Sequence, residues 1–355
     1  MERLNQFFLF LTSKMPAIRL FNLDLHVSVI EDIKDIANRI FGEKIEITNW
    51  SISGHNWVFN KPQPPPTPIN QETWKNISPQ MIEDFQELFD EMLETYDGFI
   101  VTHTPVLCML FEKYKKPILC INTCRYDQPF CWNNNGQSKE WLNTGLKRMI
   151  DNKQLTIISN NRADYNYLLH GSGISSNVIP SLCLYTKENY NPQPGKKFIL
   201  HGERSHVPPC NILLEKPKNH SWKELYEFEG IVHMPYEMST MSIFEQLFAG
   251  VPLFFPTKRF YKECLIHGTM SFISCYNKWN SGITQDDFDI WTGAADFYLF
   301  PYMYYYDSWE DLFQQLSSFT DPNREARQIW IESVKKGVHE AWKGTFEHLF
   351  PALKN

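Results

Sequence analysis

Short apolar runs alternate with amphipathic segments along nearly the whole chain, and this alternation constrains the fold more than any other feature. The first apolar run begins at Ala17 and is followed by isoleucines at helical spacing up to Gly42, a pattern that predicts a strand and then a helix. Further strands are predicted at residues 43–53, 99–103, 117–123, 155–160, 197–202, 211–216, 230–235 and 251–256. Strands that alternate with helices are typical of a parallel sheet covered by helices on both faces, so we expect an α/β protein.

The length of 355 residues exceeds the size at which a single core usually stops growing, so we expect two domains. One stretch between two strand–helix units, residues 186–197, is rich in Asn, Pro and Gly and poor in apolar side chains. We place a linker at 188–196, between an N-terminal Rossmann-like domain (1–187) and a C-terminal Rossmann-like domain (197–330). A C-terminal helix is predicted at 331–355.

Charge and composition exclude several classes of protein. The net charge is -7 and no run of Lys and Arg is longer than two residues, so we expect no nucleic-acid partner. The apolar run Phe7–Leu11 is too short to cross a bilayer, and we expect a soluble, cytoplasmic chain without a membrane span. The eight cysteines form no C-x-x-C pair, which indicates reduced core thiols rather than a zinc site.

The segment Pro235–Pro252 places two glutamates, Glu237 and Glu245, between a predicted strand and a glycine that ends a predicted helix. Ligands of open parallel sheets bind where loops leave the carboxyl ends of the strands, and helices that start there offer N–H groups to an anion. Carboxylates accept hydrogen bonds from sugar hydroxyls, while hydroxyls and helix N–H groups suit a diphosphate. The hydroxyls between the glutamates belong to Ser239, Thr240 and Ser242.

A structural interpretation of the same glutamates is equally open. Ser242 to Glu245 reads as a capping box, in which Glu245 only returns a hydrogen bond to the start of its own helix. Glu237 would then be an ordinary exposed loop residue.

The complete pattern is more specific than its parts. An E-x7-E spacing, preceded by a strand ending in Met-Pro and followed by Ala-Gly-Val-Pro, resembles the donor-binding segment of GT-B glycosyltransferases, most closely that of the large retaining family. The resemblance implies two Rossmann-like domains facing a cleft and a nucleotide diphosphate sugar as donor, with no other cofactor and no metal. It assigns Glu237 to the donor sugar and Glu245 to the ribose. We expect Met238, Ser239, Thr240 and Ser242 to bind the donor as well. The acceptor would be a glycan or another hydroxyl compound, and we expect the C-terminal helix to pack back on the N-domain.

The sequence departs from the family where the donor diphosphate is usually gripped by an Arg and a Lys. Arg204 is present, but Pro209 stands where the Lys is expected, so Lys216 or Lys218 would have to replace it. Only about 28 residues separate Arg204 from His233, which predicts an abbreviated C-domain sheet. Retention is favoured by the resemblance, and this departure leaves inversion open.

An inverting enzyme needs a base in the N-domain that takes the proton of the acceptor hydroxyl. His26 follows the first predicted strand, and Asp24 would share its face if the strand continued through both residues. The alternative is a histidine bonded to backbone beneath a loop. Further acceptor-side candidates, each with a structural alternative in a turn, an ion pair or the core, are His55, His103, Arg125 and Asp127.

Two features bear on the remaining alternatives. The acidic run that holds Asp286, Asp287 and Asp289 follows the donor segment in a predicted loop, and we do not expect it to bind magnesium. The GT-B fold is also compatible with a nucleotide-sugar epimerase or with a non-catalytic protein that binds sugars or nucleotides.

Overall fold

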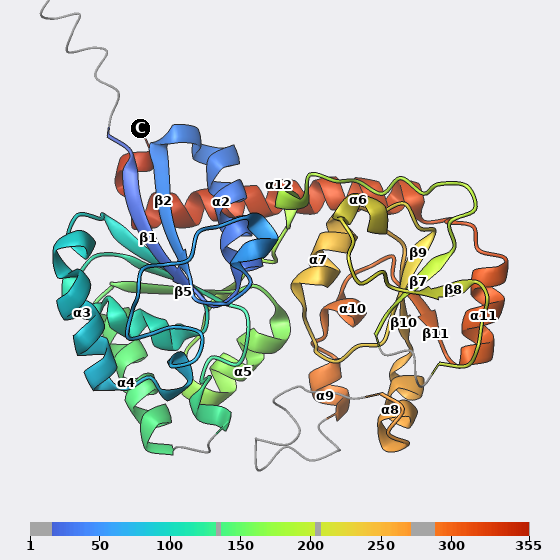
Figure 1. Ribbon diagram of the computed structural model, residues 1–355, viewed down its shortest axis with the longest axis horizontal. Helices are drawn as coiled ribbons and strands as arrows, with labels where there is room; N and C mark the ends of the chain where they lie inside the picture. The colour runs from blue at the N-terminus through green and yellow to red at the C-terminus, as the bar shows by residue number, and fades with distance from the viewer. Residues whose placement is uncertain (1–15, 133–135, 203–206, 271–287, 355) are drawn as a thin grey trace, which may run out of the picture.

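The computed structural model describes residues 16–132, 136–202, 207–270 and 288–354, and these residues form two parallel sheets (Figure 1). The first sheet has six strands in the order β2-β1-β3-β4-β5-β6, and every pairing is parallel. Its strands are β1 (Ile18–Asp24), β2 (Ile45–Ser51), β3 (Gly98–His103), β4 (Ile118–Asn122), β5 (Leu155–Ser159) and β6 (Asn177–Val178). The predicted strands at the start of the chain therefore form one doubly wound sheet.

Helices cover both faces of the first sheet because its strands are apolar on both sides. Leu20 of β1 packs in a cluster with the isoleucines of α2, while Phe21 packs in a second cluster with Phe85 of α3 and Leu142 of α4. These helices are α2 (Val27–Phe41), α3 (Pro79–Leu93), α4 (Gly136–Asp151) and α5 (Arg162–Ser172).

The second sheet has five strands in the order β11-β10-β9-β7-β8, all paired in parallel. The strands are β7 (Phe198–His201), β8 (Leu213–Glu215), β9 (Gly230–His233), β10 (Leu253–Pro256) and β11 (Tyr304–Tyr306), and the helices are α6 (Trp222–Leu225), α7 (Met241–Phe248), α8 (Lys258–Ile266), α9 (Phe288–Thr292), α10 (Asp296–Leu299) and α11 (Trp309–Ser317). Strands of three or four residues agree with the expected abbreviated sheet. The tyrosine strand β11 was not predicted.

The last helix, α12 (Arg324–Leu349), crosses both halves of the molecule (Figure 1). Near its start the buried Arg327 donates to the Gly250 carbonyl at 3.0 Å and pairs with Asp321. Near its end Phe346 packs on Phe41 of α2 with the ring centroids 5.7 Å apart. The prediction that the C-terminal helix packs back on the N-domain is confirmed. The predicted start at residue 331 falls inside this continuous helix, since neither Gly nor Pro occurs between Arg324 and residue 331.

The alternation of apolar runs and amphipathic segments predicts helices at residues 105–116 and 221–229, and both segments take another form. Residues 105–116 form two 3-10 helices, Pro105–Leu110 and Glu112–Tyr114, and all six side chains of the first are buried. Such a segment has no polar face to turn toward water, and it packs as short turns inside the core. The helix expected at 221–229 is limited to the four residues of α6, whose N-cap Ser221 forms a capping box with Glu224.

Within the described ranges, no helix combines the length and the apolar character that crossing a membrane requires. Six of the seven cysteines that the structure describes are buried and one is partly exposed, and none of these seven forms a disulfide. Cys275 lies outside the described residues.

Replacing Arg327 should destabilise the protein strongly. Arg327 is 1% exposed, and Arg327→Met removes the donor to the Gly250 carbonyl and leaves Asp321 with the Tyr304 hydroxyl but without its cation. Breaking a buried ion pair from one side costs about 3–5 kcal/mol, and we expect a loss of this size in the free energy of unfolding, measured by urea denaturation. The exposed Arg259, paired with Asp307 and Glu263, is the matched control: Arg259→Met should cost far less, because exposed ion pairs contribute little to stability. Equal losses in both variants would contradict the anchoring role of Arg327.

Candidate functional site

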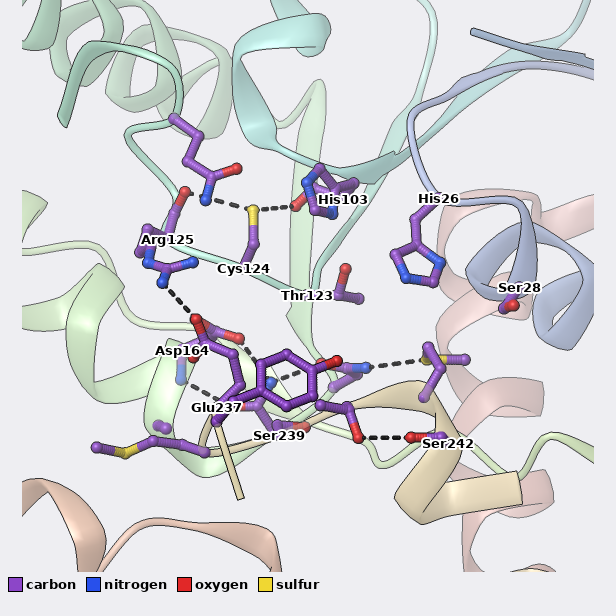
Figure 2. Close-up of a pocket in the computed structure, with 18 of the residues that line it drawn as sticks. His26, Ser28, His103, Thr123, Cys124, Arg125, Asp164, Glu237, Ser239 and Ser242 are labelled. Atoms are coloured by element: carbon purple, nitrogen blue, oxygen red, sulfur yellow. Dashed lines mark hydrogen bonds and ion pairs between the residues drawn. The ribbon is translucent and has the colours of Figure 1, made fainter. Parts of the chain in front are cut away.

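A cleft of about 570 Å³ lies between the two sheets, at the carboxyl ends of their strands. From the first domain it is lined by residues that follow β1, β3, β4 and β5, and from the second by the segment that follows β9. Figure 2 shows His26 and His103 on the first-domain side of the cleft and Glu237, Ser239 and Ser242 on the other. The cleft therefore lies where parallel α/β sheets bind ligands.

Glu237 crosses the cleft to the first domain. Its Oε1 lies 2.5 Å from Nη2 of Arg125, which belongs to the loop after β4 (Figure 2). Burial raises the pKa of Glu237, and the Arg125 charge opposes this rise. Glu237 is thus no ordinary exposed loop residue, and Arg125 is neither a surface residue nor confined to the acceptor side.

Asp164 completes this charged group and was missed in the sequence. It lies in the first turn of α5, accepts a hydrogen bond from the N-cap Asn161 at 2.7 Å and lines the cleft. Burial raises its pKa to about 6, while the Arg125 charge lowers it and the Glu237 charge raises it further. The polar run Ser159–Asp164 directly after a strand was a signal that could have identified this position.

Asp296 supplies a third carboxyl, which lies next to the loop that holds Met238 and Ser239. It is 2% exposed, and burial raises its pKa well above the usual value, while a hydrogen bond with Ser239 opposes the rise. Its backbone N–H also donates to the carbonyl of Met238 at 3.0 Å. Asp296 therefore braces the loop that carries the cleft-lining residues Met238 and Ser239.

Glu245 lies on α7, and its carboxylate is held by two residues from elsewhere in the chain. Tyr185 Oη donates to Oε1 at 2.5 Å, and Trp222 Nε1 donates to Oε2 at 3.1 Å. Burial raises the pKa of Glu245, and both donors lower it. The capping-box interpretation is wrong. The N-cap of α7 is Thr240, two residues before Ser242, and Glu245 bonds to Tyr185 and Trp222 instead of to the start of its own helix.

The start of α7 presents hydroxyls to the cleft. Thr240 and Ser242 both line it and are hydrogen-bonded to each other at 2.9 Å. No side chain caps α7, and the first N–H groups of a helix have no partner within the helix. This end of α7 can therefore meet the charge of an anion.

Two histidines face the cleft with low proton affinity. His26 is the N-cap residue of α2, and its ring centroid lies 5.9 Å from that of His103. Burial lowers the pKa of His26 to about 4 and that of His103 to about 3, so both imidazoles are neutral at pH 7. A neutral imidazole can accept a proton from a hydroxyl.

The predicted pairing of Asp24 with His26 is wrong. Asp24 is the last residue of β1 and accepts a hydrogen bond from Ser51 at 2.7 Å, while His26 already begins the turn into α2. The alternation of side chains along a strand therefore does not extend to His26. Asp24 is 0% exposed and is not among the residues that line the cleft, so it cannot take part in its chemistry as predicted.

Two acceptor-side candidates also lie away from the cleft. Asp127 is 1% exposed and forms an ion pair with Lys139 at 2.9 Å beneath the surface. His55 lines an adjoining cavity of about 470 Å³, which shares His26, Trp74 and His103 with the cleft.

Only some of the cationic residues predicted to bind the diphosphate lie among the described residues. Arg204 lies outside the described residues, as do Asp286 and Asp287 of the acidic run, while Asp289 is exposed on α9. Burial lowers the pKa of the half-buried Lys216, and the charge of Glu245, which belongs to the donor segment, raises it. No group of three or more His, Cys, Asp or Glu side chains is arranged to hold a metal ion in the part of the chain that the structure describes.

Comparison with solved structures agrees with this architecture. The glycotransferase of kitacinnamycin superposes with a TM-score of 0.52 at 11% identity, over 95% of this chain and 100% of that one. The spinosyn forosaminyltransferase SpnP gives a TM-score of 0.48 at 11% identity, over 94% and 99% of the two chains. A candidate UDP-N-acetylglucosamine 2-epimerase from Listeria monocytogenes gives 0.43 at 10% identity, over 81% and 92%.

No family model and no curated protein matches the sequence. The likeness to the kitacinnamycin glycotransferase, together with two parallel sheets facing one cleft, shows that the chain has the GT-B glycosyltransferase fold, and this prediction is confirmed.

The buried carboxyl of Asp24 should make the protein less stable at high pH. Its pKa is raised from 3.8 to about 7 by burial, so between these values the folded state binds more protons than the unfolded state. The stability that this group contributes is present at low pH and is lost as the pH rises through about 7. Asp24→Asn should gain free energy of unfolding relative to wild type between pH 4 and pH 8, by up to about 4 kcal/mol, in urea denaturation at each pH. Parallel stability profiles would show that burial does not perturb Asp24.

Proposed function

We propose that the protein is a glycosyltransferase that moves a sugar from a nucleotide diphosphate sugar to a hydroxyl group of a glycan or another acceptor. The observation that carries the proposal is a single cleft of the GT-B fold in which Glu237, Glu245 and the start of α7 face neutral histidines of the other domain. The fold supports the class of enzyme, and the residues of the cleft support the roles below.

The donor is held by the second domain in this proposal. Glu245 accepts hydrogen bonds from the ribose, and Glu237 accepts them from hydroxyls of the sugar. The diphosphate lies against the start of α7, where the hydroxyls of Thr240 and Ser242, the helix dipole and the nearby Lys216 balance its charge. When the sugar–diphosphate bond breaks, negative charge grows at this same place, and stabilising it is the main electrostatic demand of the reaction.

The acceptor lies on the first-domain side. Its hydroxyl oxygen attacks the anomeric carbon, the bond from that carbon to the diphosphate breaks, and the hydroxyl proton passes to the neutral imidazole of His26. The products are the glycoside, the nucleoside diphosphate and a protonated His26. Direct attack of this kind inverts the anomeric centre, whereas the sequence resemblance favours retention, and the configuration of the product distinguishes the two.

Replacing Glu245 or Glu237 by glutamine should weaken the binding of different ligands. Glu245→Gln should weaken binding of the nucleoside diphosphate alone about tenfold, because a hydrogen bond to a charged group is worth roughly 1.5–3 kcal/mol. Glu237→Gln should leave that affinity near wild type and weaken only the intact nucleotide sugar. Calorimetric titration with UDP, GDP, dTDP and their glucose conjugates measures both effects.

The exposed glutamate Glu332 on α12 serves as the control, and Glu332→Gln should bind like wild type. Absence of binding to every one of these nucleotides in the wild-type protein would refute the proposed function.

His26→Ala tests the acceptor side. We expect kcat for transfer to fall about 100-fold or more while nucleotide affinity stays constant, because the imidazole acts only on the acceptor proton. The side chain of His26 makes no capping hydrogen bond to α2, so its removal should not unfold the helix. His55→Ala, at the exposed position of the adjoining cavity, is the control and should keep most of the activity.

The assay is release of nucleoside diphosphate from donor and acceptor, followed by NMR of the product. A variant His26→Ala with the wild-type rate and a retained anomeric configuration would remove His26 from the mechanism. The wild-type rate should also fall as the pH drops toward about 4, where His26 gains a proton.

A further inference from the structure

The two residues that donate to Glu245 do not themselves line the cleft, whereas Glu245 does. Tyr185 belongs to a 3-10 turn (Leu184–Thr186) at the end of the first domain, and Trp222 begins α6 of the second domain. Each donor is bonded to a different oxygen of the Glu245 carboxylate. The remaining acceptor positions of both oxygens are left for a ligand in the cleft.

Both donors are fixed by one aromatic cluster. The rings of Tyr185 and Trp222 have centroids 5.7 Å apart, and the ring of Phe59 lies 5.3 Å from the first and 5.9 Å from the second. Phe59 is part of a 3-10 helix (Asn56–Phe59) in the first domain, so a first-domain side chain packs both on Tyr185 and on Trp222 of the second domain. Such aromatic contacts are worth more than their buried area alone.

Orientation and charge of Glu245 both depend on these donors. A carboxylate that reads two neighbouring hydroxyls must present its two oxygens in a fixed plane, and two N–H or O–H donors on opposite oxygens fix that plane. Burial raises the pKa of Glu245, and the bonds from Tyr185 and Trp222 are its largest opposing influences. Without them the carboxylate would be freer to rotate and easier to protonate.

We propose that Tyr185 and Trp222 are positioning residues that aim Glu245 at the ribose of the donor, and that Phe59 completes this arrangement from the other domain. The inference rests on the proposed function, since it assumes that Glu245 reads the ribose. It makes the discrimination between ribose and 2′-deoxyribose a property of residues that touch no part of the ligand. It also makes the nucleoside end of the site dependent on contact between the two domains.

The test compares each nucleoside diphosphate with its 2′-deoxy form, because the pair differs only in the hydroxyl that Glu245 is expected to read. Affinities for UDP and dUDP, GDP and dGDP, and ADP and dADP are measured by calorimetry on the full chain. The wild-type protein should prefer the ribose form of the base it binds by about tenfold. In Tyr185→Phe and in Trp222→Phe, which keep the aromatic rings, this preference should fall at least about threefold.

The pH dependence supplies a second readout that a loss of folded protein would not move. Affinity for the ribose form should decline as the pH falls and Glu245 is protonated. Because the lost donor lowers the pKa of Glu245, its removal should move the midpoint of this decline to higher pH in both variants. Tyr190→Phe is the matched control, since it removes a tyrosine hydrogen bond to the Glu229 carbonyl and should leave preference and midpoint unchanged.

The contribution of the other domain is tested at Phe59. Phe59→Ala should reduce the ribose preference in the same direction, although its side chain forms no hydrogen bond to Glu245. Trp57→Ala, two residues away at a side chain that is 72% exposed, should have no effect. Equal effects of the two substitutions would contradict the role of Phe59.

Different results would contradict the positioning role of Tyr185 and Trp222 and the proposed function. If Glu245→Gln abolishes the ribose preference while Tyr185→Phe and Trp222→Phe keep the wild-type preference and midpoint, the positioning role is wrong and the proposed function stands. If the wild-type protein binds a nucleoside diphosphate but Glu245→Gln keeps the preference, the assignment of Glu245 to the ribose fails. If the wild-type protein binds none of the six compounds and does not bind dTDP either, the proposed function fails and this inference with it.

Discussion

The ion pair between Arg125 and Glu237 is the interaction on which the charge balance of the cleft depends. It joins a guanidinium of the first domain to a carboxylate of the second, with side chains that are 14% and 22% exposed. At such burial an unpaired charge is costly, so neither partner is stable in this place without the other. The same cation also acts on Asp164, whose carboxyl follows a different strand end. Separating the domains would leave Glu237 without the cation that offsets its charge, while Arg125 would stay with Asp164 in the first domain.

The long helix α12 makes a second connection between the domains. Its 26 residues correspond to a rigid rod of about 39 Å, anchored by Arg327 in one domain and by Phe346 in the other. Two connections at different places restrict rotation of one domain against the other more than either would alone. The geometry in the cleft is therefore set partly by apolar packing of α12 on α2, as in the contact between Phe346 and Phe41.

The sequence predicted those features that depend on neighbours along the chain. Apolar runs identified the strands. Ser78 followed by Pro79 is a local signal for a helix start, and its hydroxyl accepts from the Met81 N–H as the N-cap of α3. Glu237 and Glu245 were placed in the cleft because a loop and the helix after it must lie together at a strand end. Asp24 and His26 were paired wrongly, since the prediction needed a strand through His26, two residues beyond the end of β1 at Asp24.

The partners of the site residues could not be predicted from the sequence, because the fold brings them together from distant positions in the chain. Arg125 lies 112 positions from Glu237, and Tyr185 lies 60 positions from Glu245. No periodicity links such positions. The capping box failed for a related reason, since Ser242 and Glu245 have the right local spacing but tertiary donors compete for the same carboxylate. An E-x7-E pattern thus fixes where two carboxyls lie, whereas residues outside the pattern decide whether each is ionised and which way it faces.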